Sequence, residues 1–107
     1  MKPKCEELSK IVIPSIRALV AELLIKKFNF TQIQVAKALK ISQPAVSYYL
    51  RYKRGKKAIQ AIRNSAAMSK IEELARKIAE GASEKEVRIM FCKVCQEVSK
   101  ELNLKQI

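Results

Sequence analysis

The stretch QIQVAKALKISQPAVSYYL, residues 32–50, carries two short helical patterns that meet across a few polar residues. Its first half has apolar residues at positions 33, 35, 36 and 39, which is the spacing of a buried helical face, and Thr31 precedes it as an N-cap. In the second half Ser42 is placed to cap another helix, with Pro44 inside its first turn. The small residue Ala36 lies where two such helices would cross. This spacing predicts a helix-turn-helix unit.

The register of the second helix predicts which of its side chains face outward. Val46 and Leu50 are expected to face the core, with Tyr49 beside them. The groove-facing positions are then Gln43, Pro44, Ser47, Tyr48 and Arg51. An α-helix fits the DNA major groove, where Gln, Ser and small apolar side chains contact base edges, so we expect these residues to read bases. One departure is that Lys40 occupies the turn position where glycine is common.

Basic residues follow the second helix, and polar residues open both helices. The candidates for phosphate contact are Thr31, Gln32, Ser42, Lys53, Arg54, Lys56 and Lys57. Contacts to phosphate supply affinity whatever the base sequence. The plainer alternatives are an αα-hairpin within a helical bundle and a solvated basic loop. The combination of capped helices, an outward polar face and flanking charge favours DNA.

Charge and composition limit the class of protein. The 107 residues include 22 Lys and Arg against 10 acidic residues, and residues 1–56 alone hold 12 basic and 3 acidic ones. Such an excess favours a polyanionic partner. The apolar runs are too short to span a membrane, and the sequence has no His and no phosphate-loop or catalytic motif. We therefore expect a cytoplasmic, nucleoid-associated protein with no membrane partner and no enzymatic activity.

The rest of the chain has the periodicity of helices. Pro14 interrupts an apolar face between residues 8 and 28, which predicts either a short leading helix with a fresh start at Pro14 or a kink, with a main body at about 14–27. Beyond the helix-turn-helix unit, the pattern predicts helices at about 57–64, 67–80 and 84–103. The first two of these could instead form one kinked helix.

The C-terminal part carries both capping signals and large apolar faces. Its capping signals are the pairs Ser69 with Glu72 and Ser83 with Glu86, and the glycine Gly81. The apolar faces exceed what a three-helix unit needs, which favours a homodimer through the C-terminal helices that reads a pseudo-palindrome. The alternative is a monomer in which these helices fold back on the N-terminal core. We expect an all-α fold, with a helix-turn-helix domain at 1–56 and a dimerisation region at 57–107.

The cysteines leave several interpretations open. Cys92 and Cys95 lie three apart on the last helix, and Cys5 is the third thiol. An odd number of cysteines without an export signal favours reduced thiols. One subunit offers too few ligands for a tetrahedral metal site, so no cofactor is expected, but two subunits could pool their pairs around zinc or an iron–sulfur cluster. A redox-sensitive pair and simple packing as small apolar residues are the other interpretations.

Four segments carry a family resemblance: KCEE (4–7), IPSIRALVAELL (13–24), TQIQVAKALKISQPAVSYYLRYKRG (31–55) and FCKVC (91–95). They resemble a family of small archaeal helix-turn-helix transcriptional regulators, related to the DNA-binding domains fused to archaeal thiamine-phosphate synthase-type sensor domains. The resemblance implies a DNA-binding regulator with its recognition helix at about 42–52, and it assigns contacts to Gln43, Ser47, Tyr48 and Arg51. The sensor domain of the fused relatives is absent here, so no effector ligand is implied.

These features together predict a sequence-specific regulator of transcription that binds double-stranded DNA. A non-specific chromatin or RNA-coating protein is the alternative, and a thiol- or metal-dependent redox module would rest on Cys92 and Cys95 alone. The outward Gln43, Ser47 and Tyr48 favour the regulator, because a coating surface has no need of a capped helix that presents hydrogen-bonding groups.

Overall fold

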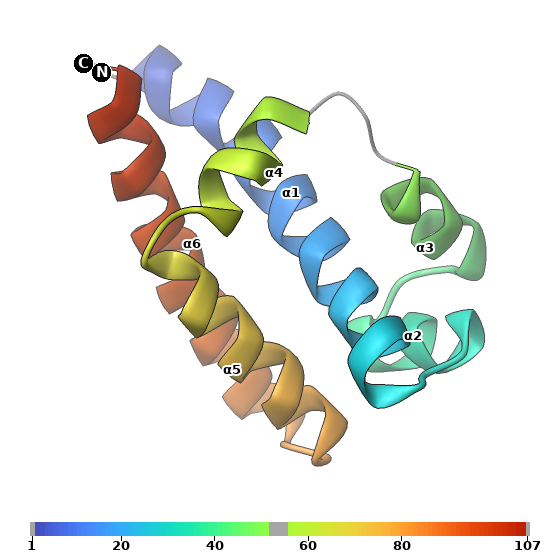
Figure 1. Cartoon of the computed structure of the whole chain (residues 1–107). Coiled ribbons are helices and arrows are strands. Elements are labelled where there is room, and N and C mark those ends of the chain that lie inside the picture. The colour runs from blue at the N-terminus through green and yellow to red at the C-terminus, as the bar shows by residue number, and fades with distance from the viewer. Residues whose placement is uncertain (1, 52–55, 107) are drawn as a thin grey trace.

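The computed structural model describes residues 2–51 and 56–106, with the side chains of 10–51 and 56–102. This part of the chain folds into α1 (Lys2–Phe28), α2 (Gln32–Leu39), α3 (Gln43–Leu50), α4 (Lys56–Arg63), α5 (Ala67–Ala79) and α6 (Glu84–Gln106). The described residues contain no strand, which confirms the predicted all-α class. In Figure 1, α1 runs through the middle of the molecule, with α2 and α3 on one side and α5 and α6 on the other.

Helix α1 continues through Pro14 without a break, so the predicted fresh start at that residue is wrong. A proline inside a helix removes one backbone hydrogen bond and costs about 3 kcal/mol. The residues around it nevertheless lie deep in the core, since Val12, Ser15 and Ile16 are all buried. Burial of this face against the other helices offsets the local penalty, because packing outweighs intrinsic propensity in most protein helices.

One hydrophobic core joins the N-terminal and C-terminal helices. Helix α1 packs against α3, α4, α5 and α6, and α5 also packs against α6. The largest fully buried side chains include Ile16, Leu19, Leu24, Ile71 and Leu74. The apolar faces of α5 and α6 are therefore used within the subunit, which is the packing expected of helices that fold back on the N-terminal core. No helix in residues 2–51 and 56–106 is long and apolar enough to cross a membrane.

The C-terminal helices are separate, and residues 64–66 connect the first two. Helix α5 begins at Ala67, two residues before Ser69, so the predicted Ser69–Glu72 capping box is wrong. The hydroxyl of Ser69 instead donates to the Ala66 carbonyl at 3.0 Å. The backbone N–H of Ala67 donates to Ser65 Oγ at 3.2 Å, so Ser65 satisfies an N–H of the first turn.

The turn between α5 and α6 follows the prediction. Gly81 has φ +88°, the left-handed conformation that glycine adopts without steric cost. At the start of α6, Ser83 Oγ accepts from the Glu86 backbone N–H at 3.2 Å and donates to Glu86 Oε1 at 3.4 Å. This confirms the expected pairing of Ser83 with Glu86 and fixes where α6 begins.

Candidate nucleic-acid interface

Helix α2 starts at a capping box that the sequence pattern contained but that we did not identify. Thr31 Oγ1 accepts from the Gln34 backbone N–H at 3.1 Å, and Gln34 Oε1 accepts from the Thr31 N–H at 2.8 Å. The T-x-x-Q spacing was the available signal. Val35 and Ala36 are buried as expected, but Ile33 is 55% exposed, so its predicted place on the buried face is wrong.

The turn between α2 and α3 has the geometry that a glycine would give, although Lys40 stands there. Lys40 has φ 60° and ψ 40°, in the left-handed region. The Ile41 N–H donates to the Ala36 carbonyl at 3.0 Å, and the Lys40 N–H donates to the Lys37 carbonyl at 3.4 Å. These two bonds form a Schellman motif and satisfy carbonyls at the end of α2. They compensate for the roughly 1–2 kcal/mol that a left-handed residue with a side chain costs.

Helix α3 packs into the hydrophobic core through Val46. Ser42 Oγ accepts from the Ala45 N–H at 3.2 Å and caps the helix, as predicted. Val46 is completely buried and packs into the hydrophobic core. Leu50, which we expected to be a second inward anchor, is 37% exposed, so that prediction is wrong. Val46 is thus the one fully buried side chain of α3, with Ala45 and Tyr49 half-buried beside it.

A contact between α1 and α3 was missed by sequence reasoning. Arg17 Nη1 donates to the Tyr49 hydroxyl at 3.2 Å in a partly buried position, and the Tyr49 ring packs edge-on against Tyr48, with ring centroids 5.5 Å apart. The signal in the sequence was a single cation inside the otherwise apolar run 16–21 of α1. Arg17 therefore ties the central helix to the predicted recognition helix.

The residues predicted to read bases lie on one side of α3, as their three- and four-residue spacing requires. Gln43, Pro44, Tyr48 and Arg51 are exposed, and Ser47 is half-buried. The Arg51 side chain folds back along the helix, where its Nε donates to the Ser47 carbonyl at 3.3 Å. Their positions leave this side of α3 open to a partner, and their roles in base reading stay a prediction.

The predicted phosphate contacts are distributed around both helix starts and the beginning of α4. Thr31, Ser42, Lys56 and Lys57 are exposed, and Gln32 is half-buried. The Thr31 and Ser42 hydroxyl oxygens accept backbone hydrogen bonds in their caps, which leaves their O–H groups able to donate to a phosphate. Lys53, Arg54 and Tyr52 lie outside the described residues.

The two described thiols occupy different surroundings on α6. Cys92 is exposed, whereas Cys95 is half-buried and packs against the core. Burial raises the Cys95 pKa from 9.0 to about 11, the neighbouring Cys92 adds to the rise, and Arg17 opposes it. Within the described residues no three His, Cys, Asp or Glu side chains are placed to hold a metal ion together. The side chain of Cys5 lies outside that part, and a site shared between subunits stays a prediction.

Comparison with known protein families identifies a helix-turn-helix domain in the chain. Residues 16–107 fit the family model of the ParB HTH domain, a match that includes the end of α1 and everything from α2 to α6. No curated protein and no solved structure matches the chain significantly. The match supports a helix-turn-helix DNA-binding family and gives no support to the archaeal regulators or to a relation with thiamine-phosphate synthase-type sensor domains.

Proposed function

We propose that this chain, which belongs to the ParB HTH domain family, is a sequence-specific regulator of transcription. In this proposal α3 lies in the major groove of double-stranded DNA. Gln43 and Ser47 contact base edges there, and Pro44 and Tyr48 supply apolar contact. Arg51 also reaches the bases, and the basic side chains that include Lys56 and Lys57 neutralise phosphates.

The observation that carries this proposal is the division of α3 into two sides. Val46 is completely buried, whereas Gln43 and Tyr48 on the other side are exposed. A helix needed only for packing has no use for amide and hydroxyl groups held at a capped, fixed position. Direct base readout needs donors and acceptors that a rigid helix presents in register with the base edges.

We further propose that two copies bind together through their C-terminal helices and that the protein acts at the nucleoid in the cytoplasm. Ile89 on α6 is 48% exposed although it is a large apolar residue. Two-fold pairing would place the recognition helices about 34–36 Å apart, one turn of the DNA helix. Sedimentation at micromolar concentration tests this pairing, and Ile89→Lys should shift the protein toward monomer if α6 forms the interface.

Selection of bound fragments from random duplexes tests the regulator proposal, because it yields a consensus only if bases are read. With that consensus as the probe, Gln43→Ala should lose discrimination at one base position, at a cost of about 1–3 kcal/mol. Lys57→Gln is the matched control, and it should weaken all duplexes alike and lower the salt slope by about one.

The same measurements separate the regulator from a chromatin or RNA-coating protein. A coating protein would yield no consensus, and its Gln43→Ala variant would bind selected and random duplexes as the wild type does. That pair of results would contradict a base-reading role for α3. If Lys57→Gln still weakened binding of all duplexes, DNA binding through the basic residues would remain supported.

A further inference from the structure

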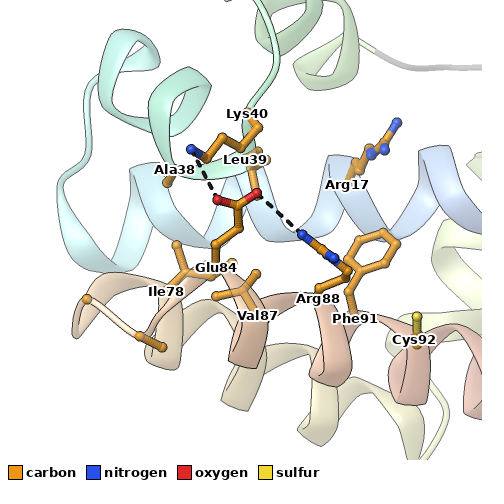
Figure 2. A pocket seen from close by; sticks show the side chains of 12 residues that line it. Arg17, Ala38, Leu39, Lys40, Ile78, Glu84, Val87, Arg88, Phe91 and Cys92 are labelled. Carbon is orange, nitrogen blue, oxygen red and sulfur yellow. Dashed lines mark ion pairs between the residues drawn. The ribbon is translucent and has the colours of Figure 1, made fainter.

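A groove of ≈ 600 Å³ lies between the turn after α2 and the hairpin of α5 and α6. Its apolar lining includes Leu39, Ile78, Val87 and Phe91 (Figure 2). Volumes of roughly 300–1,000 Å³ with mostly apolar walls are typical of sites for small organic molecules. The groove therefore has the size and lining to hold such a molecule.

Charged side chains surround this apolar lining. Glu84 lies between Lys40 and Arg88 (Figure 2), with Oε2 at 3.5 Å from Lys40 Nζ and Oε1 at 3.5 Å from Arg88 Nη2. Arg17 also lines the groove, and its guanidinium carbon lies 5.9 Å from the centre of the Phe91 ring. Three cations and one carboxylate thus line the groove, and the carboxylate pairs with two of the cations, Lys40 and Arg88. The remaining positive charge favours an anion.

Arg17 connects the groove to the predicted recognition helix. It lies over Phe91 on the groove side, and its Nη1 donates to the Tyr49 hydroxyl on α3. Lys40, at the other end of the groove, forms the left-handed turn between α2 and α3. A molecule bound here would touch both of these links between the body of the protein and the DNA-binding helices.

We propose that this groove is an effector site for a small organic anion with an apolar body, such as an aromatic carboxylate. The ring of the ligand packs on Phe91 and Val87, and its carboxylate takes the place of Glu84 beside Arg88 or engages Arg17. Engagement of Arg17 competes with its bond to Tyr49 and loosens α3. The effect on DNA affinity rests on the proposed function, whereas binding of the anion does not.

Binding can be measured without DNA. The fluorescence of 1-anilinonaphthalene-8-sulfonate should rise saturably with the folded wild-type protein, and 2-naphthoate should displace it better than the neutral 2-naphthamide. Arg88→Gln should weaken binding about two- to fivefold, the range expected for one exposed ionic contact, and Glu84→Gln should strengthen it by a similar factor. Lys100→Gln, an exposed α6 lysine outside the groove, is the matched control and should bind as the wild type does.

Equal displacement by naphthoate and naphthamide would overturn the proposal, as would charge variants that bind like Lys100→Gln. Circular dichroism of each variant shows whether it is folded.

The coupling to α3 has its own test. Saturating 2-naphthoate should weaken binding of the selected duplex severalfold in the wild type. Tyr49→Phe, which lacks the hydroxyl that accepts from Arg17, should bind the duplex more weakly and should no longer respond to naphthoate.

An unchanged duplex affinity in saturated wild-type protein would overturn the coupling. A protein that binds naphthoate but no DNA would contradict the proposed function and leave the groove standing. A protein that binds the duplex but no naphthoate would contradict the effector site and leave the proposed function in place.

Discussion

Helices α3 and α5 both pack on α1, but they differ in how much of each is buried. The eight residues of α3 include one buried side chain, Val46, while the thirteen residues of α5 include five, among them Ile71 and Leu74. Helix α5 thus contributes more to the stability of the fold, whereas most of the surface of α3 stays accessible. The proposed DNA-reading helix α3 therefore contributes fewer buried side chains to the core than α5 does.

The largest expected effect comes from removing core volume in α5. Leu74 is fully buried, so Leu74→Ala should lower the free energy of unfolding by about 2–5 kcal/mol, measured by urea denaturation. Glu73→Ala, at the exposed neighbouring position, is the control and should change stability by no more than about 0.5 kcal/mol. A Leu74→Ala effect as small as that of the control would show that the buried side chains of α5 do not stabilise the fold.

The anchor of α3 should give a smaller loss of stability. Val46→Ala should lower the free energy of unfolding by about 1–3 kcal/mol and also weaken duplex binding, because α3 loses its main buried side chain. Leu50→Ala should cost less than about 1 kcal/mol, since that side chain is already 37% exposed. If Leu50→Ala lowers the free energy of unfolding as much as Val46→Ala does, both residues anchor α3, and α3 and α5 differ less in their contribution to stability.

Two serines should change the free energy of unfolding in opposite directions when each is replaced by alanine. Ser15 in α1 is fully buried, and no described residue hydrogen-bonds to its Oγ. Ser15→Ala should therefore raise the free energy of unfolding by about 1 kcal/mol. Ser65 Oγ donates to the Ile62 carbonyl at 2.8 Å and accepts from the Ala67 N–H, so Ser65→Ala should lower it by a similar amount. Two changes of equal sign in the unfolding curves would contradict this account.

A further expected effect, confined to alkaline pH, is a dependence of stability on pH through Cys95. Its pKa is raised by burial from 9.0 to about 11, so the folded state holds the proton more tightly than the unfolded state. The resulting stability is fully present below pH 9.0 and is lost as pH rises toward about 11. Cys95→Ala should lack this part of the decline, and parallel unfolding free energies for both proteins across that range would refute the assignment.

Local signals allowed much of the helical layout to be predicted. The helix expected at 84–103 starts where α6 starts, because Ser83 and Glu86 form a cap that depends only on neighbouring residues. The same holds for Ser42 at α3 and for the glycine turn at Gly81. Caps and turns can be inferred from the sequence because the atoms that satisfy one another lie within a few residues along the chain.

The failures concern contacts between distant parts of the chain. An apolar side chain can be exposed as well as buried, so the exposure of Ile33 and Leu50 could not be inferred from their type. Pro14 was expected either to start a fresh helix or to kink α1, and packing of its neighbours against other helices accounts for the absence of a fresh start. Arg17 and Tyr49 are 32 positions apart, so no local pattern places them in contact.

The outward side of α3 has a consequence for how such a protein could diversify. Gln43 is exposed, while Val46 alone is buried in that helix. Exposed substitutions outside caps and networks change stability by no more than about 0.5 kcal/mol. New side chains at the outward positions could therefore be sampled one at a time by evolution or by design. Under the proposed function, such a change would alter the preferred duplex while Val46 stays buried in the core.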